Sequence, residues 1–360
     1  MEFNVKGISF RKDELSTITM QEIEINTISR SHFFFIPASG KTAILLLKAG
    51  DFVEQEFVDK YVERGMESIY QLEIAHPNDS QIFTKYLNAL ENANNERDRR
   101  LAKDQILKVF ADFYWKDSQK SFLSFAIATF DQYYALPSEV VDKYQASSLV
   151  LYSRALLSSA ISVATSLISG MVDPMFLKDI YNASYLMDYG LLESSDFNYV
   201  LSLACEEERN KPGEGIDILE AHHRSKEDIN IFNDHPHLGA DYAQLHKEIF
   251  FYPEIAEVIR FHHEKVDGSG FPEGLCYSAL ADTETTLIFS DYMVPYNEHI
   301  FKLGDGKIVI KEAFEKLKNG PNIFLLPLNK HFANWQRVMS WAIEKENIVI
   351  KSENQTGEAA

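Results

Sequence analysis

The segment from His262 to Leu275 reads HHEKVDGSGFPEGL, and no other part of the chain says as much about its fold and chemistry. Two adjacent histidines lead into an acidic loop interrupted by glycines, which suits metal-assisted chemistry better than core packing. Upstream, Ile255, Val258 and Ile259 recur at helical spacing, so His262 continues an inward-facing stripe. Both imidazoles are therefore expected to leave the last turn of a helix close to a core.

The loop after the histidines has conformational signals of its own. Gly268 and Gly270 provide positive-φ freedom or allow a close backbone approach, and Pro272 stops the chain from re-entering the helix. The simpler alternative is a capped helix whose two histidines bond to nearby carboxylates.

The whole segment resembles the signature of the HD-GYP family, HHExxDGxGYP. Phe271 stands where the family has Tyr. The matching positions are His262, His263, Glu264, Asp267, Gly268, Gly270 and Pro272. The resemblance implies an all-helical domain that hydrolyses cyclic di-GMP, a phosphodiester, with the help of bound metal ions.

Two further elements extend the resemblance. His235 lies in DHPHLG, which is similar to the family's metal-binding HPxxG element; Pro236 is expected in the first turn of a helix, and Gly239 is expected where a backbone approaches. Asp291 follows an apolar run in LIFSDYM, as does a metal-binding Asp of the family. A helix cap or a hydrogen-bonded buried carboxylate is the alternative for this residue. The stretch from His235 to His262 suffices for one helix out and one back, which brings three imidazoles together.

The resemblance fails at the His-Asp pair from which the family takes its name. The segment SYLMDYGLLE keeps Asp188, but Met187 replaces the His and Leu191 replaces the Lys. The family also has a histidine one helix earlier, where this chain has none, and Tyr152 or Ser153 is expected near that position.

These departures are selective with respect to the two metal positions of the family. One metal position keeps only the ligands Asp188 and Asp291. The other keeps all of its ligands, which are Asp188, His235, His262 and His263. The metal ligands that the resemblance implies are Asp188, His235, His262, His263 and Asp291. Three imidazoles and a carboxylate suit Fe or Mn, with Zn as an alternative, and one ion is expected rather than two.

The resemblance also implies roles in catalysis and substrate binding. The catalytic residues are Asp188, Glu264 and Asp267, and the substrate-binding residues are Lys265, Gly268, Gly270, Phe271 and Pro272. With Leu191 in place of a lysine and a formal net charge of −19, phosphate binding is weakened, and weak hydrolysis is expected.

The sequence is compatible with two alternatives to a weak cyclic di-GMP phosphodiesterase. One is a catalytically inactive module that binds metal or nucleotide and acts through partners. The other is hydrolysis of a different phosphate ester with one metal ion.

A second histidine pair, His222 and His223, lies in the longer connection before His235. A surface helix over GIDILEAHHRSKED with exposed histidines is expected. The alternative is that one of the pair replaces a missing metal ligand.

The rest of the chain separates into a small module and a helical remainder. Residues 1–78 are expected to form an α+β module, with strands in HFFFIPASGKTAILLLKAG and ESIYQLEI and a helix in EQEFVDKYVERG. Residues 79–119 are expected to be a solvated helical connector, residues 120–345 the HD-GYP-like helical domain, and residues 346–360 a flexible tail. The expected fold class is mainly α.

Composition and sequence pattern indicate the cellular location and the class of ligand. Cys205 and Cys276 are too few for a disulfide framework, and the first residues lack the apolar core of a signal peptide, so a cytoplasmic location is expected. The uncharged run from Ala155 to Val172 is rich in serine, which favours a buried bundle helix over a membrane span. The expected ligand is cyclic di-GMP or a related phosphodiester, not a nucleic-acid polymer; protein partners and a homodimer remain open.

Overall fold

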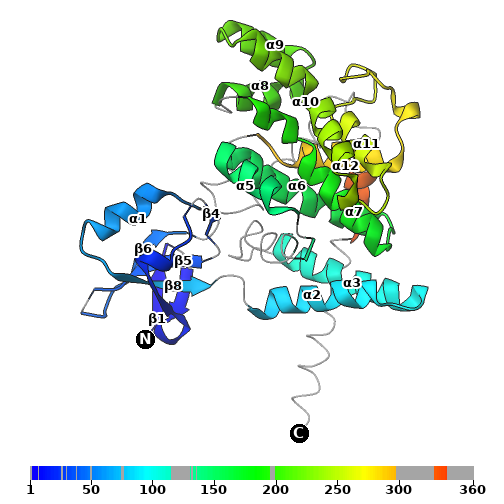
Figure 1. Ribbon diagram of the computed structural model, residues 1–360. Coiled ribbons are helices and arrows are strands. Elements are labelled where there is room, and N and C mark those ends of the chain that lie inside the picture. Colours follow the sequence, from blue (N-terminus) through cyan, green and yellow to red (C-terminus); the bar gives the residue numbers. More distant parts are fainter. Residues whose placement is uncertain are drawn as a thin grey trace.

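The computed structural model describes residues 2–6, 8–25, 27–29, 31–37, 39–48, 51–73, 77–114, 130, 133–134, 136–194, 199–296 and 328–338. Strands, one α-helix and two short 3-10 helices form an N-terminal module, and helices make up the remainder (Figure 1). The expected class, a mainly helical chain with an α+β module at its start, is confirmed.

The N-terminal module is built on a four-stranded antiparallel sheet with the order β3-β8-β5-β6. The hairpin β1-β2 and the short pair β4-β7 accompany it. The strands are β1 (Glu2–Val5), β2 (Ile8–Arg11), β3 (Ser16–Thr19), β4 (Thr27–Ile28), β5 (Ser31–Phe35), β6 (Ile44–Leu47), β7 (Phe52–Val53) and β8 (Ser68–Glu73), with the helices η1 (Lys12–Glu14), η2 (Met20–Glu22) and α1 (Gln55–Val62).

Both faces of this sheet are covered, and because side chains alternate along a strand, neighbouring residues pack into different clusters. In β5, Phe33 packs into a cluster that includes Val58 of α1. The next residue, Phe34, points to the other face and meets Phe10 of the β1-β2 hairpin, with ring centroids 4.4 Å apart. The predicted strands and the predicted helix of this module are confirmed.

The helical remainder surrounds α6 (Figure 1). Its elements are α2 (Pro77–Glu91), α3 (Glu96–Tyr114), α5 (Ser138–Ser147), α6 (Leu149–Ile168), α7 (Pro174–Leu186), η4 (Tyr189–Glu193), α8 (Tyr199–Asn210), α9 (Glu214–Ala221), α10 (Lys226–Leu245), η5 (Lys247–Ile249), α11 (Ile255–Val258), η6 (Ile259–Phe261), η7 (Tyr277–Ala279) and α12 (Asp282–Met293), and residues 328–338 are also helical.

Helix α6 is the central element of this core. Every residue from Leu151 to Ile168 is buried, and the Ser148 side chain caps the helix by accepting a hydrogen bond from the Leu151 N–H at 3.3 Å. Within the described ranges, α6 is the one helix long and apolar enough to cross a membrane, yet its apolar window is wholly buried inside the protein. The prediction of a buried bundle helix is confirmed.

The segment predicted as one solvated connecting helix is instead the two helices α2 and α3. The helix is interrupted before Asn95, whose side chain accepts a hydrogen bond from the Asp98 N–H at 2.9 Å and so caps the start of α3. Phe83 and Phe110 are fully buried, and their rings meet at 6.2 Å within the same cluster as α6. The connector therefore contributes to the helical core, and the domain boundaries stay a prediction.

Helix α10 starts earlier than the sequence suggested. The Ser225 side chain accepts from the Asp228 N–H at 3.0 Å and caps the helix, so Pro236 lies inside it and not in its first turn. The prediction for Gly239 is confirmed, since a Cβ there would come within 2.8 Å of the Leu186 carbonyl oxygen. Residues 328–338, which include His331, form a further helix; the expected flexible tail, residues 346–360, lies outside the described residues.

The stability of this core is expected to depend on pH through His331. This side chain is buried, lies 3.1 Å from the Thr285 hydroxyl of α12, and packs on Phe289. Burial lowers the pKa of His331 to about 4, whereas the unfolded chain keeps a pKa near the ordinary 6.5. The unfolded state therefore binds the extra proton between these values, and the free energy of unfolding should fall as the pH drops from about 6.5 to about 4, by on the order of 3 kcal/mol.

Chemical denaturation at several pH values would measure this effect. The His331→Gln variant keeps a hydrogen-bonding group but does not titrate, so its stability should vary less with pH. His222→Gln, at an exposed position, should behave as wild type. Identical slopes for His331→Gln and wild type would contradict this account.

Candidate metal centre

Four buried side chains meet in the helical core: Asp188, His235, His262 and His263. Asp188 lies between α7 and η4, His235 lies in α10, and the two adjacent histidines follow η6. Each offers one ligand atom, and these atoms all lie within 4.8 Å of one another. A carboxylate with three imidazoles at this separation can hold a transition-metal ion.

The orientation of His235 follows from the proline beside it. Pro236 has no N–H, so it cannot make the helical hydrogen bond to the carbonyl of Phe232, four residues earlier. The Nδ1–H of His235 donates to that carbonyl instead, at 2.6 Å, and leaves the lone pair on Nε2. Burial lowers the pKa of His235 to about 3, with the neighbouring His262 contributing, so the ring is neutral at pH 7, as a metal ligand must be.

His262 is oriented in the same way. Its Nδ1–H donates to the Ile259 carbonyl at 2.7 Å, so Nε2 carries the lone pair. That Nε2 is buried, has no hydrogen-bond partner among the described residues, and lies 3.8 Å from Asp188 Oδ1. A buried nitrogen without a partner is costly unless something binds it, and a metal ion fits.

His263 completes the group of imidazoles. Its Nε2 lies 2.9 Å from Nε2 of His235, and its ring stacks on Phe271 with centroids 4.7 Å apart. Burial, with the two neighbouring histidines, lowers the pKa of His263 well below the ordinary value. Because His235 carries its proton on Nδ1, the Nε2–H of His263 can donate to His235 Nε2 when no ion is bound, and the other tautomer of His263 would present both Nε2 lone pairs to a metal ion.

Asp188 is held as a carboxylate by a buried arginine that sequence reasoning missed. The Arg154 Nε donates to Asp188 Oδ2 at 3.0 Å, and the Tyr296 hydroxyl donates to Oδ1 at 2.6 Å. Burial alone would raise the pKa of Asp188, but Arg154 and the nearby histidines hold it below the ordinary value. The carboxyl therefore remains charged and available as a ligand.

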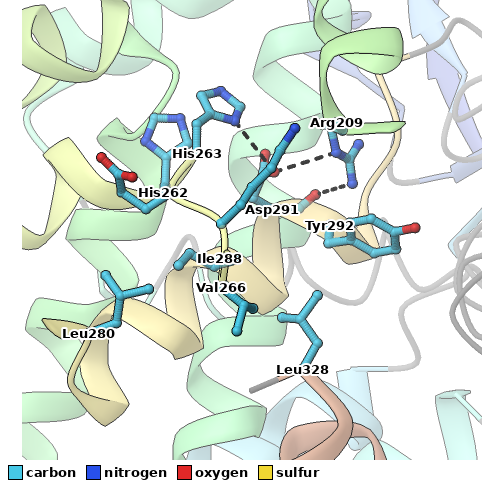
Figure 2. A pocket seen from close by; sticks show the side chains of 11 residues that line it. Arg209, His262, His263, Val266, Leu280, Ile288, Asp291, Tyr292 and Leu328 are labelled. Atoms are coloured by element: carbon cyan, nitrogen blue, oxygen red, sulfur yellow. Dashed lines mark hydrogen bonds and ion pairs between the residues drawn. The ribbon is translucent and has the colours of Figure 1, made fainter. Parts of the chain in front are cut away.

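Asp291 lies outside the group of four, although the sequence predicted it as a ligand. Arg154 Nη2 donates to Asp291 Oδ1 at 2.5 Å, and Arg209 Nε lies 3.4 Å from Oδ2. His263 Nδ1 is 4.0 Å from the same Oδ2, and Figure 2 shows Asp291 between His263 and Arg209. Its ligand role stays a prediction; in this geometry its carboxylate is bound by two arginines.

A signal for Arg154 was present in the sequence. Arg154 directly precedes the long uncharged run that begins at Ala155. Helix α6 extends on both sides of Arg154 and buries it completely. A charge in such a position needs carboxylate partners. It stands one residue beyond Tyr152 and Ser153, the positions expected near the missing histidine.

Glu264 and Asp267, the other predicted catalytic residues, accept hydrogen bonds that hold the loop in its conformation. The buried Glu264 carboxylate accepts hydrogen bonds from the backbone N–H groups of Glu273, Gly274 and Leu275 at 2.7, 3.1 and 2.7 Å. Asp267 is exposed and accepts from the Ser269 N–H and hydroxyl at 3.0 and 2.6 Å. Their catalytic roles stay predictions.

The glycines of the loop behave as expected from the sequence. Gly268 has a φ of +77°, and a Cβ on Gly270 would lie 2.4 Å from the Lys265 backbone nitrogen. The Phe271-Pro272 peptide bond is cis. The conformational predictions for these glycines are confirmed; the substrate-binding roles assigned to residues 265 to 272 stay predictions.

A pocket opens beside the centre (Figure 2). Arg209 and Lys265 bring positive charge to it, and Lys265 Nζ donates to the Glu208 carbonyl at 2.7 Å. Burial lowers the pKa of Lys265 below the ordinary value. The lining residues are Arg209, His262, His263, Glu264, Lys265, Val266, Leu280, Ile288, Asp291, Tyr292 and Leu328. The pocket thus combines two metal-site histidines, cationic side chains and an apolar wall.

The second histidine pair lies at the surface. Helix α9 ends at Ala221, one residue before His222, and both His222 and His223 are exposed. They are not members of the buried group of four, which agrees with the expected surface position. The expectation of one helix over GIDILEAHHRSKED is wrong, because residues 222–225 separate α9 from α10.

Comparisons with known proteins add little to this geometry. No protein-family model and no curated protein matches the chain. The chain is similar to the solved structure of Bd1817, described as a HDG"Y"P protein from Bdellovibrio bacteriovorus, at 17% identity over 91% of this chain and 99% of that chain, with a TM-score of 0.38. A TM-score of this size does not establish a shared fold, so the interpretation of the centre depends on its own residues.

Gly190 is expected to be required for the position of His235. A Cβ at Gly190 would lie 2.4 Å from the His235 carbonyl oxygen and 2.7 Å from its Cα. Gly190→Ala should therefore push α10 away, destabilise the fold by roughly 1–3 kcal/mol, and weaken metal binding by about 10-fold or more. Calorimetric titration with Mn²⁺ and denaturant unfolding measure both effects. Leu245→Ala, at an 80% exposed position of the same helix, is the control; equal Mn²⁺ affinity in the two variants would refute the prediction.

Glu264→Gln is expected to loosen the loop and leave the metal ligands in place. The amide NH₂ would face a backbone N–H that the carboxylate now accepts, and we expect a loss of about 1–3 kcal/mol in the free energy of unfolding. Metal content per chain should remain as in wild type. Glu273→Gln, in the exposed part of the same loop, should change neither quantity. A stable Glu264→Gln protein that loses turnover would instead support the predicted catalytic role.

Proposed function

We propose that this chain is a divergent, metal-dependent phosphodiesterase of the HD-GYP type that acts weakly on cyclic di-GMP in the cytoplasm. The observation that carries the proposal is the meeting of three imidazoles and Asp188 at one point. The HHEKVDGSGFP and DHPHLG segments that supply the imidazoles are those in which the sequence resembles the family.

The chain's own residues would hold one ion and keep it accessible. Fe or Mn, with Zn as an alternative, would bind through Asp188 and the three histidines. Such an ion supplies Lewis-acid polarisation of the phosphodiester and lowers the pKa of a water molecule. The hydrogen bonds of His235 to Phe232 and of His262 to Ile259 leave Nε2 of each ring as the nitrogen that would hold an ion.

The pocket supplies recognition of an anionic nucleotide. Arg209 and Lys265 offset the repulsion between a phosphate and a chain of formal charge −19. The apolar wall formed by Val266, Leu280 and Ile288 suits the face of a base. We expect slow turnover, on the order of 10² to 10⁴-fold below a two-metal site, because one ion gives less stabilisation of the developing charge.

A catalytically inactive binding module is the second candidate, and the burial of two side chains favours it. Met187 and Leu191 stand where the family has its histidine and its lysine, and both are fully buried in the apolar core. Neither side chain can contact a phosphate. A protein of this kind would bind the metal or the nucleotide and act through partners.

Metal analysis and turnover on one sample would test the proposal. We expect about one ion per chain in protein purified without added metal, and slow conversion of cyclic di-GMP to linear or mononucleotide products. His263→Ala should lose the ion and the turnover together. The double variant His222→Ala/His223→Ala, at exposed positions, should retain both.

The outcomes of this experiment separate the candidates. Metal and nucleotide binding without turnover would favour the binding module. Faster hydrolysis of another phosphodiester would change the substrate. A wild-type protein without bound metal, even after Mn²⁺ is added, would refute the metal centre.

A further inference from the structure

The guanidinium of Arg154 lies between Asp188 of the metal centre and the neighbouring Asp291. Its Nε donates to Asp188 Oδ2 at 3.0 Å, and its Nη2 donates to Asp291 Oδ1 at 2.5 Å. The side chain comes from the second turn of the buried helix α6 and is itself completely buried. One cation therefore bridges two carboxylates that lie far apart in the sequence, one after α7 and one in α12.

The remaining contacts of Arg154 fix the guanidinium in place. Its Nη1 donates to the Val294 carbonyl and lies 3.5 Å from the Asp291 carbonyl. The ring of Tyr296 lies over the guanidinium, 3.4 Å from the ring centroid to the carbon of the group. Such a group, bonded at all three nitrogens and covered on one face, cannot swing away as a surface arginine can.

This placement uses the oxygen atoms that a second metal ion would need. An ion between Asp188 and Asp291 would have to bind Asp188 Oδ2 and Asp291 Oδ1, and both accept hydrogen bonds from Arg154. Asp188 Oδ1 accepts from the neutral Tyr296 hydroxyl and not from a cation, and it faces the side of the centre where His262 Nε2 lies, 3.8 Å away. A divalent ion on the Arg154 side would also meet a permanent positive charge at contact distance without water between them.

We propose that Arg154 is a built-in cation that occupies the position between Asp188 and Asp291 and so limits the centre to a single metal ion. Arg154 is a positioning residue: it holds Asp188 charged and directs one oxygen toward the three imidazoles. Arg209 binds the other side of Asp291, with Nε 3.4 Å from Oδ2, and does not bridge to Asp188 in any described contact. The single-ion limit therefore belongs to Arg154 and not to Arg209.

This inference rests on the metal-binding part of the proposed function and is independent of the nucleotide. Its test uses the full-length protein titrated with Mn²⁺, with bound ions counted by elemental analysis after removal of free metal. Electron paramagnetic resonance of the same samples distinguishes isolated Mn²⁺ from two coupled ions, so the readout does not depend on activity.

We expect one isolated Mn²⁺ in wild type. Arg154→Gln frees both carboxylate oxygens and removes the charge, so it should bind close to two ions with a coupled spectrum. Arg154→Lys keeps a cation and should remain at one ion, and Arg209→Gln, which removes the neighbouring arginine, should also remain at one. Circular dichroism checks that each variant is folded.

Two coupled ions in wild type or in Arg154→Lys would overturn the inference and leave the metal centre intact. A folded Arg154→Gln that still binds one ion would also overturn it. If Arg154→Gln does not fold, the counts for wild type and Arg154→Lys decide the question. Absence of any bound ion in wild type would refute the metal centre itself, and this inference with it.

Discussion

The buried ion pair of Arg154 and Asp188 determines where the helices around the centre can lie. It joins α6 to the turn after α7, and the second bond of Arg154, to Asp291, adds α12. A charge in such a core is tolerated only when it is paired, and removal of one partner of a buried pair typically costs about 3–5 kcal/mol. The three elements therefore cannot shift independently, and the ligand positions near Asp188 are fixed by the same contacts that satisfy the charges.

A second constraint, a proline inside a helix, sets the chemistry of the centre. Pro236 leaves the Phe232 carbonyl without its helical partner, and the ring of His235 takes that place. Backbone geometry thus fixes which nitrogen of the imidazole carries the proton. The proton of His262, which follows η6, is fixed on Nδ1 in the same way, because the Ile259 carbonyl accepts the Nδ1–H. Two rings are oriented by main-chain carbonyls, which do not titrate and hardly move.

The sequence predicted what depends on local patterns and missed what depends on long-range contacts. The three histidines and Asp188 could be predicted because short motifs carry them, and the strands of the N-terminal module because their pattern is local. The position of Arg154 beside a long uncharged run was a signal, but its pairing with Asp291 could not be predicted, because the two residues are 137 apart in the sequence and only the fold brings them together. The position of Pro236 was misjudged for a different, local reason: the Ser225 cap that starts α10 is a stronger signal than a proline further along.

The departures from the family motif become consistent when charge is considered. Where the family has a histidine next to Asp188, this chain has Met187, which is fully buried among apolar side chains. A centre that lacked that ligand and had no Arg154 would leave Asp188 and Asp291 as buried charges with less compensation, which a folded core does not tolerate. Arg154 and Arg209 balance the two aspartates with residues of the chain itself. The helical core can therefore keep its packing whether or not an ion is bound, and the ion is left to serve binding or chemistry alone.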